Sequence, residues 1–348
     1  MVVAVTESEA RRDEFRRDHP GIALFRAAAP DEVRVYLVAH GLMAANDLPV
    51  QVAAAGDGNM NCTLRVITPR RRLIVKQARP WVEKYDHIPA PWDRSHVEAA
   101  FYESVATVAG VGNRMPGLMH ADHDARVLVL EDLGDGGDFT SIYQGIRLSQ
   151  DHFDTLVDYL RRLRQVDVPG DRRTLFANRD MRALNHEHIF RFPLAGDNGL
   201  ALDGITPGLQ PAADALKRDT AFVARVTALG ARYLEDGASL VHGDYFPGSW
   251  VRKGDGVAVI DPEFCFLGPA EHDSGVMMAH LIMAGDAPAR IDAVEEAAAH
   301  DHGDRALVRQ FAGVEIMRRL IGVAQLPLSV PLERKQELLG RARQLVLA

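Results

Sequence analysis

The spacing of hydrophobic residues changes in character near residue 130. Before that point, short apolar runs typical of strands are separated by turn-forming segments. These runs cover residues 50–55, 62–68, 72–78 and 126–130. Residues 1–20, 30–38 and 93–108 instead show helical patterns. The first part of the chain is therefore expected to combine several strands with a few helices.

Beyond residue 130 the apolar positions recur mainly at helical spacing. The expected helices cover residues 152–166, 178–192, 219–234, 276–284, 292–300 and 305–323. Two short apolar runs, just before residues 242 and 261, interrupt this pattern and predict strands. Residues 196–211 are rich in Gly, Pro and Asp, and we expect a long surface loop or lid there.

Composition narrows the class of protein. The 348 residues suggest roughly two domains, and 40 basic against 48 acidic residues give a formal charge of −8, which disfavours non-specific nucleic-acid binding. Cys62 and Cys265 are far apart in sequence, so neither a disulfide framework nor a cysteine-based zinc site is expected. The N-terminus lacks an apolar signal core, and no stretch reaches the roughly 18 apolar residues of a membrane span. We expect a reduced, cytoplasmic protein without membrane partners.

Three acidic residues follow the two short apolar runs in the second part. Asp244 lies in the sequence HGD, and Asp261 and Glu263 lie two residues apart where a strand is expected to end. Residues two apart in extended chain point the same way, so this pair can hold a hard cation. Taken singly, either motif is more often an ordinary turn. Their occurrence together, each after an apolar strand, favours a functional site.

A glycine-containing turn and a lysine strand offer a complementary set of groups in the first part. The turn consists of Gly56, Asp57, Gly58 and Asn59, and its backbone amides could approach phosphates, although a hairpin turn without a ligand is commoner. Lys76 lies within an apolar run, where an unpaired ammonium is costly. It is expected to bind a carboxylate or a phosphate; the alternative is an edge-strand lysine facing water. Glu98 is favoured over Glu103 as its carboxylate partner.

Several further residues have both a functional and an ordinary interpretation. Glu131 and Leu133 follow a strand at an expected hinge, where backbone groups could bond an adenine edge, or they could be turn residues. Asp273 could cap the helix that follows or brace the catalytic loop. Arg318 and Arg319 lie among apolar residues, so at least one guanidinium is expected to face inward or a cleft. They could clamp a substrate or form a structural ion pair.

Six segments of the chain, in the order in which they occur, resemble those of the aminoglycoside-phosphotransferase and choline-kinase-like superfamily, and within it those of the methylthioribose kinases. The matching segments are GDGNMN (56–61), IVKQARPWV (74–82), VLEDLG (129–134), HGDYFPGS (242–249), IDPEFCFLGP (260–269) and MRRLIG (317–322). The resemblance implies an α+β, protein-kinase-like bilobal fold. It places a small antiparallel-sheet N-terminal lobe at residues 1–132 and a mainly helical C-terminal lobe at residues 133–348.

The resemblance also implies roles for individual residues. Asp244 would be the catalytic aspartate, with Asp261 and Glu263 holding Mg²⁺ and Arg318 and Arg319 binding the acceptor. The nucleotide, ATP with GTP as an alternative, would be bound by Gly56, Asp57, Gly58, Asn59, Lys76, Glu98, Glu131 and Leu133. His242, Ser249 and Asp273 would support the site. Ser249 stands where protein kinases have a metal-binding Asn, and Glu263 would replace that ligand.

The expected activity is phosphoryl transfer to a hydroxyl of a ribose-like sugar. An antibiotic-inactivating phosphotransferase that acts on a sugar or nucleoside antibiotic is the alternative, and a nucleotide-binding pseudokinase is a remote one. The sequence departs from the family after Asp244, where Tyr245, Phe246 and Pro247 replace Leu-His-Thr, and these changes lie near the acceptor. The expected partner is thus a small sugar-containing molecule. The sequence leaves open whether the chain forms a homodimer.

Overall fold

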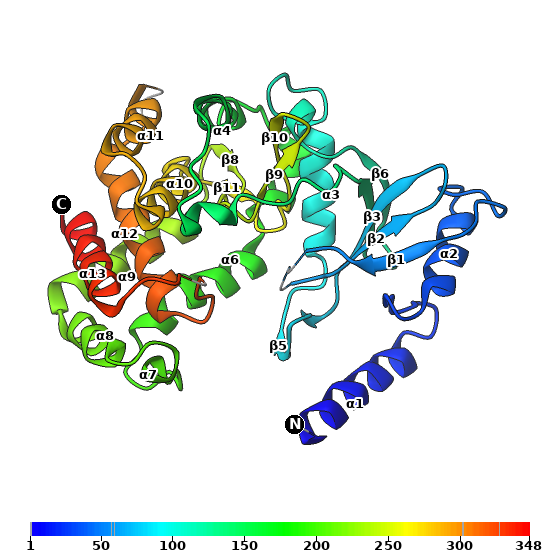
Figure 1. Cartoon of the computed structure of the whole chain (residues 1–348), viewed down its shortest axis with the longest axis horizontal. Helices are drawn as coiled ribbons and strands as arrows, with labels where there is room; N and C mark the ends of the chain where they lie inside the picture. The colour runs from blue at the N-terminus through cyan, green and yellow to red at the C-terminus, as the bar shows by residue number, and fades with distance from the viewer. Residues whose placement is uncertain (1, 57, 59, 301–302, 327) are drawn as a thin grey trace. The chain divides into compact units, whose positions relative to one another are not determined.

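The computed structural model describes residues 2–56, 58, 60–300, 303–326 and 328–348, with side chains from residue 8 onward. The chain forms two compact units (Figure 1). The first unit comprises Met1–Ala106 and Pro116–Leu133, and the second comprises Thr107–Met115 and Gly134–Ala348.

An antiparallel sheet of five strands forms the centre of the first unit, in the order β1-β2-β3-β7-β6. The strands are β1 (Gln51–Ala54), β2 (Cys62–Ile67), β3 (Arg72–Gln77), β7 (Val127–Glu131) and β6 (Leu118–Asp122). Because side chains alternate along a strand, Leu73 and Val75 of β3 point to one face and Lys76 to the other. The first face packs on Val33 and Leu37 of α2 (Pro30–Ala39) in a common apolar core.

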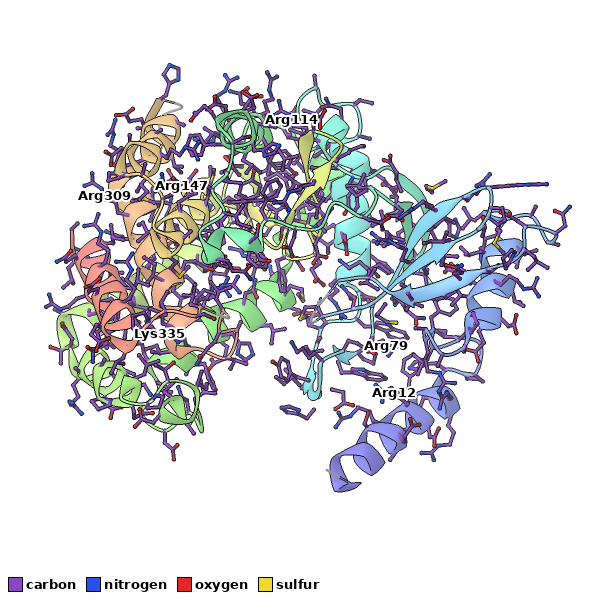
Figure 2. The ribbon with its side chains drawn as sticks, in the orientation of Figure 1. Arg12, Arg79, Arg114, Arg147, Arg309 and Lys335 are labelled. Atoms are coloured by element: carbon purple, nitrogen blue, oxygen red, sulfur yellow. The ribbon has the colours of Figure 1, made fainter. Side chains whose placement is uncertain are left out.

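Two helices and a hairpin complete the first unit. Helix α3 (Arg94–Val105) contacts β6 and β7, while α1 (Val2–Asp18) packs through Phe15 against Trp81. Trp81 belongs to the short hairpin β4 (Trp81–Val82) and β5 (Tyr85–Pro89). Next to it, Arg79 is almost fully buried and bonds to Glu83 and to the Phe25 carbonyl (Figure 2).

Helices make up most of the second unit. They are α4 (Gln150–Leu163), α5 (Gly170–Arg173), α6 (Arg179–His186), α7 (Leu202–Ile205), α8 (Leu209–Arg218), α9 (Thr220–Leu234), α10 (Glu271–Ala284), α11 (Pro288–His300), α12 (Arg305–Ile321) and α13 (Leu332–Leu347). Helix α12 packs against both α10 and α13. Two small antiparallel sheets pair β8 (Ser239–Val241) with β11 (Phe266–Gly268) and β9 (Trp250–Lys253) with β10 (Gly256–Val259). The predicted α+β class, with an antiparallel-sheet part followed by a mainly helical part, is confirmed.

The prediction of a long loop at residues 196–211 is wrong in part, because α7 and the start of α8 lie within this segment. Pro211 occupies the first turn of α8, where proline is tolerated, so its presence did not signal a loop. The Asp203 carboxylate accepts hydrogen bonds from the Gly208 and Gln210 backbone amides, and Lys335 of α13 donates to the Thr206 hydroxyl (Figure 2). The Asp203 bonds are local and close the turn between α7 and α8, whereas the Lys335 bond is a tertiary contact. The buried residues of α8, Leu209, Ala213 and Leu216, recur at helical spacing, a signal that the loop prediction overlooked.

The sequence predicted neither a disulfide between the two cysteines nor a membrane-spanning helix, and both expectations can be compared with the described residues. Cys62 and Cys265 are both free, so the expectation of no disulfide between them is confirmed. Among the described helices, none combines the length and apolar character that crossing a membrane requires.

The core of the first unit gives a stability prediction. Leu37→Ala should lower the free energy of unfolding by about 2–5 kcal/mol, because Leu37 is fully buried and its removal leaves a cavity against the sheet. Val35→Ala on the same helix is the control, since Val35 is 59% exposed and its replacement should change stability by no more than about 0.5 kcal/mol. Denaturant titration of both variants tests this. Equal losses would contradict the packing of α2 on the sheet.

Candidate active site

The loop after β8 carries Asp244 in a tightly constrained turn. Gly243 has a φ of 87°, a left-handed conformation that favours glycine. A Cβ added at this position would lie 2.2 Å from the Phe264 carbonyl oxygen, so a side chain does not fit. The glycine of the HGD sequence is therefore required by the close approach of the chain segment that follows Glu263.

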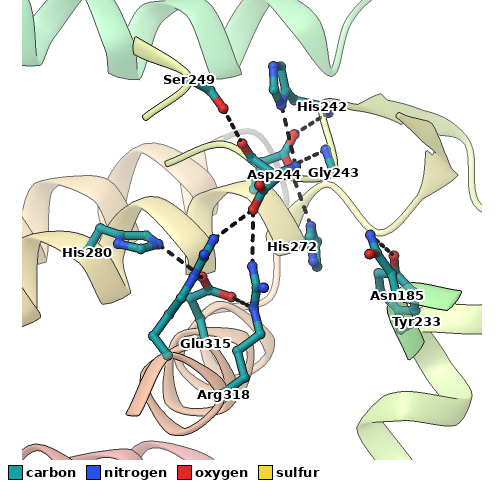
Figure 3. Close-up of polar contacts among 12 residues, drawn as sticks. Asn185, Tyr233, His242, Gly243, Asp244, Ser249, His272, His280, Glu315 and Arg318 are labelled. Carbon is teal, nitrogen blue, oxygen red and sulfur yellow. Dashed lines mark hydrogen bonds and ion pairs between the residues drawn. The ribbon is translucent and has the colours of Figure 1, made fainter. Parts of the chain in front are cut away.

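Asp273 braces this loop from the first turn of α10. Its carboxylate accepts hydrogen bonds from the backbone amides of His242, at 2.6 Å, and Gly243, at 3.0 Å (Figure 3). Burial by itself would raise the pKa of Asp273, but the hydrogen bond and charge of His272 and the contacts with His242 lower it below its usual range. Of the two roles expected for Asp273, bracing is the one observed.

His242 and Ser249 make further hydrogen bonds that hold the loop carrying Asp244. The His242 ring is fully buried, and Nε2 lies 2.9 Å from the Ile260 carbonyl oxygen while Nδ1 faces the Asp244 amide at 3.4 Å. Burial lowers the pKa of His242, so a neutral ring that donates from Nε2 fits both contacts. The Ser249 hydroxyl donates to the Asp244 carbonyl at 2.9 Å. His242 thus connects the loop to the residue just before Asp261.

Two arginines of α12 hold the Asp244 carboxylate. Arg318 Nη2 and Arg319 Nη2 lie 3.1 and 3.0 Å from the same oxygen, Oδ1. The Asp244 side chain remains 21% exposed, whereas those of Arg318 and Arg319 are 11% and 7% exposed. Arg319 also lies over the Phe246 ring, 4.6 Å from its centroid. The sequence prediction of an inward-facing guanidinium is confirmed for Arg319.

Glu315 is the residue that sequence analysis missed. It is buried one turn before the arginines, where it accepts from Arg318 Nε and, at 2.7 Å, from Arg319 Nε (Figure 3). Burial by itself would raise the pKa of Glu315, but the two guanidinium charges hold it well below its usual range. An acidic residue three and four positions before two arginines, among apolar neighbours, was the available signal.

A histidine and a tyrosine extend the network behind Glu315. His280 of α10 lies with Nε2 3.0 Å from Glu315 Oε1 and Nδ1 2.6 Å from the hydroxyl of Tyr143, in the short helix η2 (Thr140–Gln144). Burial lowers the pKa of His280 to about 4 and raises the pKa of Tyr143. At neutral pH the tyrosine therefore donates to a neutral imidazole, which donates to the carboxylate. Each buried polar group in this chain of contacts is satisfied.

Asp261 and Glu263 follow β10 as the sequence predicted. Asp261 has a φ of 70°, a left-handed conformation that is uncommon outside glycine and best tolerated by Asn and Asp. Glu263 is only 2% exposed. Backbone strain at an ionisable residue is typical of functional sites. Because Asp261 is left-handed and lies beyond the end of β10, the extended-chain argument that the two side chains point the same way does not apply here. Two carboxylates two residues apart still supply the oxygen ligands that Mg²⁺ prefers, so the residue types fit such an ion.

The first unit contains the other predicted groups. Lys76 Nζ lies 2.8 Å from both carboxylate oxygens of Glu98 on α3, and the pair is buried. Glu103 is exposed, so the predicted Lys76–Glu98 pair is confirmed. The alternative of an edge-strand lysine is wrong, since β3 lies between β2 and β7.

The remaining nucleotide-site candidates lie at strand ends in the same unit. Gly56, with a φ of 69°, and Gly58 are exposed between β1 and β2, whereas Asp57 and Asn59 lie outside the described residues. Glu131 ends β7, and its carboxylate accepts from the Gly117 amide at 3.2 Å. Leu133 follows it directly. This contact joins the end of β7 to the residue before β6, so the turn and backbone roles considered for Glu131 both stay predictions.

The buried Glu315 gives a prediction with a defined pH dependence. Glu315→Gln should lower the free energy of unfolding by about 3–5 kcal/mol at pH 7, because it leaves buried guanidinium charge without its partner. The folded-state pKa of Glu315 is depressed, so its contribution is present above the ordinary value of 4.5 and is lost as the pH falls through the folded-state value. The difference in the free energy of unfolding between the wild type and the variant should therefore become smaller at acidic pH.

Glu337 provides the matched control for Glu315→Gln. It also pairs with an arginine three positions away, Arg334, but its side chain is 65% exposed. Glu337→Gln should change stability by no more than about 1 kcal/mol. Denaturant titrations across pH would contradict the account if both variants behaved alike.

Comparison with known proteins places this geometry in a family. The fold resembles the spectinomycin phosphotransferase APH(9)-Ia, in complex with ADP and spectinomycin, with a TM-score of 0.56 at 13% identity, covering 91% of this chain and 97% of that one. It also resembles the choline kinase LicA of Streptococcus pneumoniae, with a TM-score of 0.52 at 12% identity over 91% and 98% of the two chains. These similarities confirm the predicted protein-kinase-like fold class.

Relatives that are similar in sequence are also kinases of small molecules by name. A methylthioribose kinase of Exiguobacterium sibiricum is 28% identical over 68% of this chain, and one of Erwinia tasmaniensis is 28% identical over 74%. The chain spans 62% and 66% of the lengths of these relatives, which is less than two thirds. The model of the APH phosphotransferase enzyme family matches residues 51–311, well over half of the sequence. The chain therefore belongs to the APH phosphotransferase enzyme family.

Proposed function

We propose that this protein is an ATP-dependent small-molecule kinase that phosphorylates a hydroxyl of a ribose-like sugar. The observation that carries the proposal is the Asp244 carboxylate, which is partly exposed and held through one oxygen by Arg318 and Arg319. Among the described residues, none donates a hydrogen bond to its other oxygen. A carboxylate that is fixed through one oxygen and has its other oxygen available can orient a hydroxyl and accept its proton.

Asp244 is assigned as the group that receives the acceptor proton. As the acceptor oxygen bonds to the γ-phosphorus and the bond from that phosphorus to the β–γ bridging oxygen breaks, the hydroxyl proton passes to Asp244. The two guanidinium groups hold the Asp244 carboxylate in place through Oδ1, so the proton would pass to a carboxylate of fixed orientation. Transition states of this reaction are loose, so most of the protein's contribution is positioning and charge neutralisation.

Asp261 and Glu263 would hold Mg²⁺, and Lys76 would contact the nucleotide phosphates. Bound Mg²⁺ and ATP would supply the phosphoryl group and neutralise part of its charge. The ion pair with Glu98 supports the role of Lys76, because it fixes the ammonium in a buried position on a central strand. Gly56 and Gly58, with Asp57 and Asn59 between and beside them, would cover the phosphates, and the backbone at Glu131 and Leu133 would bind the adenine.

The acceptor is proposed from the sequence relatives. The two methylthioribose kinases cited above are named for a ribose derivative, and they match most of this chain at 28% identity. The similarity to spectinomycin phosphotransferase is one of fold at 13% identity and carries no information about the acceptor. Arg318 and Arg319, which bond to the carboxylate of the proposed base, would line the acceptor site.

Replacement of the proposed base and metal ligand tests the chemistry. Asp244→Asn and Asp261→Asn should each lower kcat with the true acceptor on the order of 10²–10⁴-fold. Both should remain folded, and Asn at 261 tolerates the left-handed backbone. Asp255→Asn, in the exposed turn between β9 and β10, is the control and should retain full activity. Substantial ATP-dependent turnover in both site variants would refute the assignment.

A panel of acceptors tests the substrate. Methylthioribose, ribose, choline, spectinomycin and an aminoglycoside would each be incubated with the protein and ATP or GTP, and products would be detected by mass spectrometry. We expect a phosphorylated product from methylthioribose or ribose. A product only from an antibiotic would identify the protein as an inactivating phosphotransferase. Tight nucleotide binding without any product would favour a pseudokinase.

A further inference from the structure

We propose that the first unit contains a binding site for a divalent transition metal of the Zn²⁺ type, formed by His40, His120 and Asp122. One ligand atom from each residue lies within 4.8 Å of the other two. His40 Nε2 and Asp122 Oδ2 are 3.6 Å apart, and the rings of His40 and His120 are 4.9 Å apart. The site does not depend on the proposed kinase activity.

Two secondary structure elements bring these residues together. His40 is the C-cap of α2, and His120 and Asp122 lie on β6, the edge strand of the sheet. Residues two apart on a strand share a face, so His120 and Asp122 point the same way. The pairing of β6 with β7 shifts register between Leu118 and His120. Such a bulge twists an edge strand and is a common means of re-aiming side chains.

The outer contacts leave the ligand atoms available. His40 Nδ1 lies 2.9 Å from the Tyr36 carbonyl oxygen, to which it donates, so that the lone pair is on Nε2, facing Asp122. Asp122 Oδ1 accepts from the amides of Asp124 and Ala125, and Oδ2 accepts from the Tyr36 hydroxyl at 3.0 Å. Metal-binding histidines usually donate their second ring nitrogen to a carbonyl or carboxylate in this way.

His120 provides the observation that an ordinary ion pair does not explain. Its Nε2 atom is enclosed by protein, yet it has no hydrogen-bond partner among the described residues. A protonated His40 beside Asp122 would account for their 3.6 Å contact without a metal. That arrangement leaves His120 Nε2 unsatisfied, which is unfavourable for an enclosed polar atom. A metal ion would satisfy all three side chains.

The ligand set selects the class of metal. Imidazole suits Zn²⁺, Cu²⁺, Ni²⁺ and Fe²⁺, whereas Mg²⁺ prefers oxygen ligands alone. In a tetrahedral zinc site with bonds of about 2.0–2.2 Å, ligand atoms lie roughly 3.3–3.6 Å apart. The His40–Asp122 separation already matches, and small side-chain rotations would bring His120 to that distance. Three protein ligands leave a fourth position for water, and the ion would fasten α2 to the sheet edge.

Cobalt substitution on the full-length protein tests the proposal. Co²⁺ would be titrated in excess Mg²⁺, which saturates oxygen-only sites, and the intense visible absorption of four-coordinate Co²⁺ would be recorded, followed by its displacement with Zn²⁺. We expect one equivalent to bind. His40→Ala, His120→Ala and Asp122→Asn should each abolish the absorption, and Tyr36→Phe should weaken binding roughly 10–100-fold through loss of its bond to Asp122.

His123→Ala is the matched control for the metal test. His123 lies three residues after His120, but its ring faces His96, at 4.7 Å, and it belongs to a different cluster. This variant should bind Co²⁺ like the wild type. No four-coordinate absorption in the wild type, or its persistence in His40→Ala or His120→Ala, would overturn the proposal. Circular dichroism would verify that each variant folds. If His120→Ala does not fold, the test rests on His40→Ala, because His40 is partly exposed.

Discussion

The second unit depends on a buried carboxylate that neutralises two buried guanidinium groups. Glu315 bonds to Arg318 and Arg319, and these in turn hold one oxygen of Asp244. The four formal charges, two positive and two negative, cancel. Removing charges from water is costly unless each is paired, so any one of them requires the others. The catalytic candidate is therefore part of a structural network, and its position is set by the interior of α12.

A second set of contacts fixes the backbone on which Asp244 is carried. Asp273 accepts two amide hydrogen bonds from the HGD segment, and His242 connects that segment to Ile260. The side chain and the backbone of Asp244 are thus positioned independently, from α12 and from α10. This preorganisation suits a reaction in which the protein's main task is to hold charges in place.

The ion pair of Lys76 was predictable from sequence because an apolar run surrounds this charged residue. Lys76 was expected to need a carboxylate for that reason, and Glu98 supplies it. Glu315 was missed although its partners Arg318 and Arg319 follow three and four positions later on the same helix; its contact with His280, by contrast, joins residues on two different helices. Helix α7 was missed because four residues give no helical period, whereas α8 carries buried residues at helical spacing within a segment whose Gly, Pro and Asp content suggested a loop.

The central proposal is that, within the second unit, Asp244 accepts the acceptor proton while Asp261 and Glu263 hold Mg²⁺. A crystal structure with Mg²⁺ and a non-hydrolysable ATP analogue tests it most directly. The account predicts Mg²⁺ bound to Asp261 and Glu263, with the Asp244 carboxylate facing the terminal phosphoryl group. A nucleotide bound elsewhere, or Mg²⁺ held without either of these carboxylates, would contradict it.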